Sequence, residues 1–196
     1  MSASTRLPAL IVLLLAALAL TGCGQDSAEA GDGTGHNDAD VAFASDMIQH
    51  HAQALTMVDL TLGKELDPEV ADLAEQIRAA QSPEIETMVD WLNEWDEPVP
   101  ETMRDHANAH GGHSEDLDTD MPGMMSAEQM AELEKARGEE FQTLWLELMV
   151  EHHEGAIEMA RTEQANGENA KAVALAEKIV KTQQREIDTM EQLLGS

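Results

Sequence analysis

The sequence predicts an all-α protein, an up-down four-helix bundle built from two copies of a helical hairpin. No segment alternates polar and apolar residues over the length of a strand. The chain also aligns with itself at a shift of 102 residues, which places Met47 on Met149. Two hairpins that each carry an apolar face bury those faces most simply by packing together as one bundle.

The repeat comprises two separate stretches that keep one register. Residues 47–57 match residues 149–159 in the pattern M-[IV]-x-H-H-x-x-A-[LI]-x-M, and residues 73–92 match residues 175–194. Ten of the twenty positions in the second stretch are identical; in the first copy they are Leu73, Ala74, Glu75, Ile77, Gln81, Glu84, Ile85, Thr87, Met88 and Leu92. A shared register over both stretches indicates duplication of a two-helix unit.

The first copy, residues 40–95, is predicted to form two helices. Helical periodicity runs over residues 40–62, and Gly63 is a plausible stop. Asp67 then offers an N-cap, followed by a proline at the first position of a helix that extends to about residue 95. Pro83 lies inside this second helix, where we expect it to kink or locally unwind the backbone.

The second copy, residues 127–196, begins with a short extra helix. Ser126 and Gln129 form a capping-box pattern for a helix that ends near Gly138. The long helices of this copy are predicted at residues 139–165 and 169–194, with a turn at Asn166-Gly167 between them. Residues 40–196 together make the predicted bundle domain.

The N-terminal segment is predicted to be a targeting signal and a linker, outside the fold. Residues 1–22 carry a positive start and a short apolar stretch, which are typical of an export signal. Small residues then lead to Cys23, the only cysteine, in a pattern that resembles the bacterial lipobox. We therefore expect lipidation at Cys23, an extracytoplasmic location on the bacterial cell membrane, and a flexible tether over residues 23–39.

Composition excludes several functions. The 39 acidic against 11 basic side chains give a formal net charge of −28, which disfavours nucleic acid as a partner. No nucleophile–base constellation, phosphate-binding loop or GxGxxG motif is present. We therefore expect a protein that is not an enzyme.

The duplicated motif predicts a metal site. On a helix its methionines and histidines share one face about 120° wide, the face that a bundle would bury. Thioether sulfur is soft and selects Cu(I), imidazole binds copper readily, and the only thiol is assigned to the lipid. The ligand type and the oxidising location predict copper, chiefly Cu(I). The candidate ligands are Met47, His50, His51, Met57, Met149, His152, His153 and Met159.

The linker between the copies, residues 96–126, is a possible second metal-binding segment. Its composition is rich in histidine and methionine, and the alternative is a solvated loop of biased composition. The candidate residues here are Met103, His106, His110, His113, Met121, Met124 and Met125.

Alternatives to copper remain open from the sequence. Facing histidines in a four-helix bundle could ligate haem, or serve a copper redox protein. The histidines alone could bind zinc, and a metal-free bundle that binds a partner would keep the same residues in its core. No histidine has glutamate three residues before it, which argues against a di-iron centre. The sequence also leaves open whether the two motifs form one site or two, and which protein would receive the copper.

The motif resembles the DUF305 family of exported bacterial proteins. The resemblance rests on residues 47–57, on residues 149–160, and on the Met121-Pro122-Gly123-Met124 element before the second copy. It implies a ferritin-like helical bundle over about residues 40–196. It also implies copper binding and a contribution to copper tolerance, because some members of the family have these properties. The residues that match the family motif are Met47, His50, His51, Met57, Met149, His152, His153 and Met159.

Overall fold

The computed structural model describes residues 35–104 and 121–195. Within these residues the secondary structure consists of helices without strands, as predicted. The helices are α1 (Asp38–Asp59), α2 (Pro68–Glu94), α4 (Ala127–Lys135), α5 (Gly138–Asn166) and α6 (Ala170–Leu194). The predicted signal, Cys23 and most of the predicted tether lie outside the described residues.

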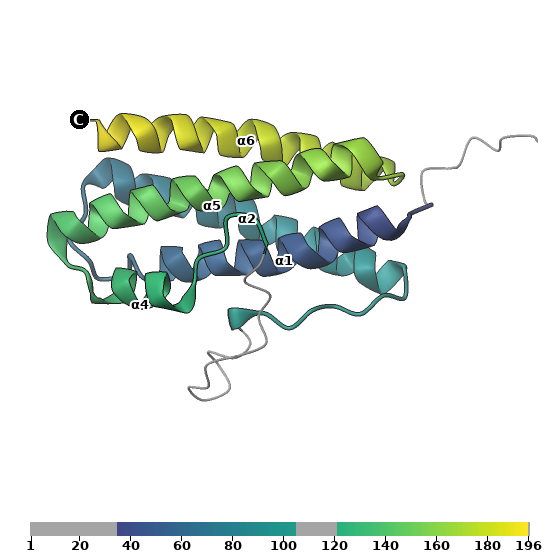
Figure 1. Cartoon of the computed structure of the whole chain (residues 1–196), viewed down its shortest axis with the longest axis horizontal. Helices are drawn as coiled ribbons and strands as arrows, with labels where there is room; N and C mark the ends of the chain where they lie inside the picture. Colours follow the sequence, from purple (N-terminus) through teal and green to yellow (C-terminus); the bar gives the residue numbers. More distant parts are fainter. Residues whose placement is uncertain (1–34, 105–120, 196) are drawn as a thin grey trace, which may run out of the picture. The chain divides into compact units, whose positions relative to one another are not determined.

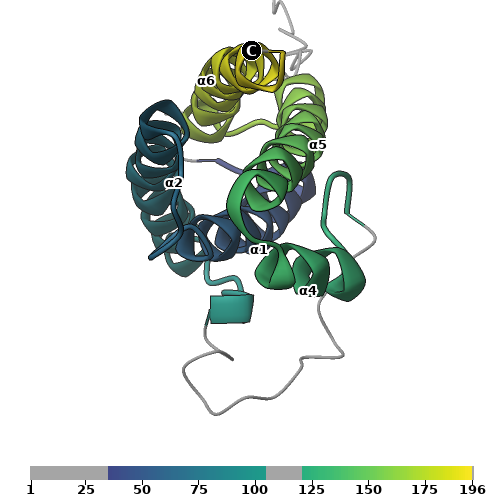
Figure 2. The ribbon, with the colours of Figure 1, turned by 90° about the vertical axis from the view of Figure 1, so that its left-hand side faces the viewer.

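Four long helices pack side by side as an antiparallel bundle (Figures 1 and 2). Each predicted hairpin is present, because α1 packs against α2 and α5 packs against α6. The two hairpins meet chiefly through α1 and α5. The short α4 lies outside the four, beside α5 (Figure 2).

Helix boundaries differ from the predictions at a few points. The helix α1 ends at Asp59, whereas the sequence predicted residue 62, and α4 ends at Lys135, before the predicted stop at Gly138. The helix α2 continues through Pro83 without interruption, so the expected local unwinding is wrong, whereas the expected kink stays a prediction. A single proline removes one backbone donor, and burial of the apolar face on both sides of it holds the helix together.

The predicted caps are in place, with one difference in detail. Ser126 and Gln129 form the reciprocal capping box that starts α4. Asp67 occupies the N-cap of α2 but makes no capping bond. Its carboxylate instead accepts a hydrogen bond from Gln142 Nε2 at 2.7 Å, and its backbone N–H donates to Gln142 Oε1 at 2.9 Å. The start of α2 is thereby tied to α5.

Two buried apolar clusters fill the bundle, one toward each end. Core 1 gathers around Phe141, Trp145 and Leu133, and core 2 around Phe43 and Leu92. Along both α1 and α5 the paired histidines lie in sequence between residues of these two clusters. The candidate site therefore lies in the middle of the bundle.

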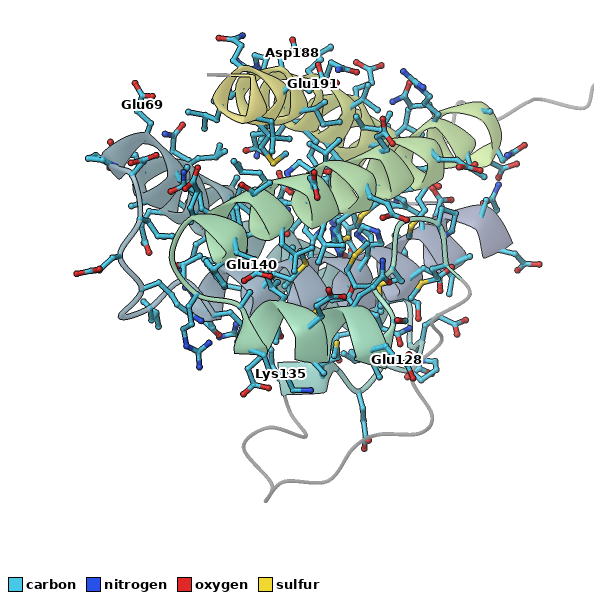
Figure 3. All side chains as sticks on the ribbon, turned by 60° about the vertical axis from the view of Figure 1, so that its left-hand side comes forward. Glu69, Glu128, Lys135, Glu140, Asp188 and Glu191 are labelled. Carbon is cyan, nitrogen blue, oxygen red and sulfur yellow. The ribbon has the colours of Figure 1, made fainter. Side chains whose placement is uncertain are left out.

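The acidic side chains are mostly on the outside. Glu69, Asp188 and Glu191 are exposed and point away from the helices (Figure 3). None of the helices in the described part of the chain is long and apolar enough to span a membrane.

One pair of carboxyl groups is buried where α1 begins beside the end of α5. Asp40 accepts backbone hydrogen bonds from Asn37, Glu168 and Asn169 at 2.7, 3.1 and 2.9 Å. Burial opposes ionisation of Asp40, but these bonds outweigh it and hold its pKa below the ordinary value. Burial and the neighbouring Asp40 raise the pKa of Glu163 to about 8. At neutral pH Asp40 is therefore ionised and Glu163 keeps its proton.

This pair predicts a loss of stability as pH rises. The unfolded chain releases the Glu163 proton near the ordinary glutamate pKa of 4.5, whereas the folded protein keeps it to about pH 8. The contribution is therefore fully present below about pH 4.5 and is lost as pH rises to about 8. We expect Glu163→Gln to remove this decline, measured by urea unfolding between about pH 5 and 8.5. Glu158→Gln, an exposed change on the same helix, is the control, and a decline that persists in Glu163→Gln would contradict the assignment.

Candidate metal centre

The four motif histidines come together at the contact between α1 and α5. All four side chains are completely buried. The rings of His50 and His152 have centroids 3.8 Å apart, and those of His152 and His153 lie 6.4 Å apart. The two copies of the motif therefore contribute to one histidine cluster.

The outer histidines of this cluster are each held by a buried glutamate. His51 Nε2 lies 2.9 Å from Glu84 Oε2, and His153 Nε2 lies 2.7 Å from Glu186 Oε2. A carboxylate that accepts the Nε2–H fixes the tautomer and leaves the Nδ1 lone pair for a ligand bond, as in carboxylate–histidine–metal triads. Glu84 and Glu186 therefore orient these two histidines as hydrogen-bonded carboxylates orient the histidine ligands of known metal sites.

Sequence reasoning missed Glu84 and Glu186 as partners of the histidines. Most acidic residues of this chain belong to solvated helix faces, and these two looked no different. One signal could have found them, because both lie 33 residues after a motif histidine and both belong to the identical positions of the repeat.

The electrostatics of the cluster favour uncharged inner histidines. Burial lowers the pKa of His50 to about 3, with a further contribution from His51, and burial lowers the pKa of His152 well below its ordinary value. Burial also opposes ionisation of Glu84. Hydrogen bonds to His51 and to Lys178, whose Nζ is 3.2 Å from Glu84 Oε1, nevertheless hold the pKa of Glu84 below the ordinary value.

Several ring nitrogens of the cluster are buried without a hydrogen-bond partner. Within the described residues these are the Nδ1 atoms of His50, His51 and His153, and both ring nitrogens of His152. A buried polar atom left unsatisfied costs about 1–3 kcal/mol, so a group of five is unusual in a folded core. A neutral imidazole has one N–H and one nitrogen with a free lone pair, so each of the four rings offers one donor of the kind that copper and zinc take.

A short strap, residues 121–125, covers the cluster from one side. His50 Nε2 lies 3.0 Å from the carbonyl oxygen of Pro122. The buried Gln53 holds the next part of the strap, since its Oε1 accepts from Met125 N at 2.6 Å and its Nε2 donates to Met125 O at 2.9 Å. The strap packs on α5 at Gly155, where an added Cβ would clash with the Pro122 carbonyl.

The motif methionines divide between the two cores. Met57 and Met149 are fully buried in core 1. Met47 is fully buried in core 2, against which the half-buried Met159 packs. The face predicted to be buried is therefore buried, and its sulfur atoms lie on both sides of the histidines in sequence.

The linker candidates have different surroundings. Met125 is buried in core 1, whereas Met121 and Met124 are half-buried in the strap. Met103 Sδ accepts a 3.7 Å hydrogen bond from Gln53. The remaining linker candidates, His106, His110 and His113, lie outside the described residues. Within the described ranges no three His, Cys, Asp or Glu side chains converge to hold a metal ion.

Comparison with known proteins establishes the family. A family profile described as "Domain of unknown function (DUF305)" matches residues 40–194. The chain belongs to the DUF305 family. No curated protein matches the sequence.

Solved DUF305 structures share the fold. A candidate secreted DUF305 protein from Streptomyces coelicolor is 31% identical, with a TM-score of 0.68 over 80% of this chain and 92% of that chain. A DUF305 fragment from Deinococcus radiodurans is 32% identical, with a TM-score of 0.67 over 81% and 97%. CopM in its Cu(II)-bound form is 28% identical, with a TM-score of 0.64 over 80% and 95%. CopM has also been solved in Cu(I)-bound and Ag-bound forms.

Proposed function

We propose that this DUF305 protein binds copper as Cu(I) outside the cytoplasm, and that it sequesters the ion or passes it on without catalytic turnover. The observation that carries the proposal is the group of buried, unpartnered imidazole nitrogens on His50, His51, His152 and His153. A ligand that uses those lone pairs would recover the cost of leaving them unsatisfied.

The surrounding residues favour copper over other metals. No three His, Cys, Asp or Glu side chains converge in the described part of the chain, so a metal held by the motif histidines needs a further donor of another kind. Methionine sulfur serves Cu(I) in this role but is not one of the usual ligands of zinc. Buried methionines flank the paired histidines in sequence on both helices, and soft sulfur favours Cu(I). The relative CopM, solved with copper and silver, is consistent with this preference.

The arrangement disfavours haem between the two motif helices. The rings of His50 and His152 are already in van der Waals contact, with centroids 3.8 Å apart. A porphyrin plane would have to separate α1 from α5, which pack directly against each other.

The proposal includes lipidation of Cys23, because a lipid anchor would hold the bundle at the outer face of the membrane.

A competitive titration tests the proposal. The full chain is titrated against a chromophoric Cu(I) chelator under reducing conditions, beside His50→Asn/His152→Asn and the control His36→Asn. His36 stacks on Trp95 with ring centroids 4.6 Å apart, outside the cluster. Loss of primary ligands should weaken Cu(I) binding at least about 100-fold, since even outer-shell changes cost 10–100-fold.

The Cu(I) affinity of the double variant is compared with that of the control, and its folding is checked separately. Circular dichroism must show that the double variant remains helical. A wild-type chain that does not compete for Cu(I), or a folded double variant that binds as tightly as the control, would contradict the proposal.

A further inference from the structure

The two long helices of each copy contain three methionines, and each of these has a methionine at the matching position of the other copy. The pairs are Met47 and Met149, Met57 and Met159, and Met88 and Met190. Other core positions changed between the copies, for example Phe43 to Trp145, Ile48 to Val150 and Leu55 to Ile157. Some core positions that only fill space are also identical, for example Leu73, Ile77 and Leu92. The methionines differ from these because each of them also carries a soft thioether donor, so their arrangement in the bundle decides what they can bind.

The His51–Glu84 contact fixes the register between α1 and α2. Met47 lies four residues before His51, and Met88 lies four residues after Glu84. Because α1 and α2 run antiparallel, both steps move one turn in the same direction along the bundle. Met47 and Met88 therefore lie at the same level, and both are completely buried in core 2.

The side chain of Met159, on α5, extends toward the level of Met47 and Met88. The bond from Asn37 Nδ2 to Asn166 O and the His50–His152 contact show that α5 runs antiparallel to α1. This register puts Met159 about one turn from Met47. Helical side chains lean toward the N-terminus of their own helix, so these two side chains lean toward each other. Met159 packs against core 2, and we call Met47, Met88 and Met159 the first methionine triad.

The repeat builds a second methionine triad from Met57, Met149 and Met190. The His153–Glu186 contact sets the register of α5 and α6, and Met149 and Met190 lie one turn beyond it. Met57 lies opposite Trp145, whose Nε1 donates to the Met57 carbonyl at 3.0 Å. All three side chains are completely buried in core 1.

We propose that the two methionine triads are separate thioether sites, each able to bind one soft monovalent ion such as Cu(I) or Ag(I), with Met88 and Met190 as ligands. The inference rests on the proposed copper-binding function and adds ligands from α2 and α6 that the histidine motif does not contain. Three neutral sulfur donors suit a soft monovalent cation and offer little to zinc, calcium or magnesium.

The charges near the triads fit a cation. Buried Glu186 lies one helical turn from Met190, and buried Glu84, which already pairs with Lys178, lies one turn from Met88. A carboxylate at that range in a low-dielectric interior offsets part of the cost of burying a single positive charge.

The two triads differ in their access to solvent. Met159 is half-buried and lines a cavity of about 250 Å³ together with Asp46, Pro122 and Glu158. The second triad is sealed inside core 1. The first triad is therefore the one that an ion entering from solvent reaches directly.

Silver titration of the full chain, labelled with ¹³C at the methionine methyl groups, tests this inference. We expect Ag(I) to shift the methyl signals of all six triad methionines, assigned from single Met→Leu variants. Native mass spectrometry should show one Ag(I) fewer in Met88→Leu, one fewer in Met190→Leu and two fewer in the double variant. Met130→Leu is the matched control, because Met130 is only partly buried and lies outside both triads.

Met→Leu conserves volume, so the variants should stay folded. Ag(I) that binds with unchanged Met88 and Met190 signals, or equal stoichiometry in the double variant and the control, would overturn the triads and leave the histidine proposal standing. A chain that binds neither Ag(I) nor Cu(I) would overturn both.

Discussion

Gly155→Ala is expected to destabilise the protein by about 2 kcal/mol, although the same change inside a helix ordinarily stabilises it. Alanine has a higher helix propensity than glycine by about 1 kcal/mol, so α5 alone would gain. The gain is outweighed by a clash, because the added Cβ would overlap the Pro122 carbonyl and lie 2.6 Å from Gly123 Cα. Overpacking against backbone costs about 1–3 kcal/mol, and here it also moves the strap.

Displacing the strap has consequences at the histidine cluster. Pro122 O lies 3.0 Å from His50 Nε2, so a shift of the strap removes the hydrogen-bond partner of that nitrogen. The two bonds between Gln53 and Met125 would also be strained or lost. Gly123 also packs closely on α5, because a Cβ at its own position would lie 2.7 Å from Glu151 O, and its φ of +73° favours glycine.

Urea unfolding at neutral pH measures the effect. Gly35→Ala is the control, because nothing lies within 4 Å of a Cβ at that position. A Gly155→Ala variant as stable as the wild type, or more stable, would show that the strap does not pack on α5 in solution.

The fold was accessible from sequence because its determinants are local or repeated. Helical periodicity, the Ser126 capping box and the Asn166-Gly167 turn each depend on a few neighbouring residues. The internal repeat then supplied the pairing of helices into hairpins. Only the fine details failed, such as the end of α1 and the expected unwinding at Pro83, where tertiary packing decides the outcome.

The site was only partly accessible, because it depends on which helices are neighbours. Burial of the motif face followed from periodicity, but the contact between His50 and His152 required knowing that α1 packs on α5. Glu84 and Glu186 are distant in sequence from their histidines. The strap packs on α5 through close contact between the backbones of Gly155 and Pro122, which a pattern of side chains in the sequence does not predict. Only the internal repeat, in which Glu84 and Glu186 occupy identical positions, indicated these two glutamates.

The metal-free protein is expected to lose stability steeply as pH falls below about 6.5, because of His50 and His152. The folded-state pKa of His50 is about 3 and that of His152 is also strongly lowered, in both cases chiefly by burial, whereas an ordinary histidine has a pKa of 6.5. The unfolded chain therefore binds more protons than the folded one between these values. The stabilising contribution is fully present above about pH 6.5 and is lost as pH falls toward about 3.

The slope of the unfolding free energy with pH follows from how many more protons the unfolded chain binds than the folded protein. Each histidine contributes up to about 1.4 kcal/mol per pH unit inside this window. The two rings are in contact, so a proton on one further disfavours a proton on the other. Glu163 acts in the opposite direction over part of this range, but its contribution is the same in any variant that leaves the α1–α5 end intact.

Urea unfolding from about pH 4 to pH 8, with a chelator present to keep the protein free of metal, separates these contributions. The difference between wild type and His50→Gln/His152→Gln isolates the two histidines, because glutamine does not titrate and the Glu163 contribution cancels. We expect the wild-type curve to fall more steeply than the variant curve below pH 6.5. Parallel curves would mean that the inner histidines are already protonated or solvated in the folded protein, and the unpartnered nitrogens would then no longer call for a metal.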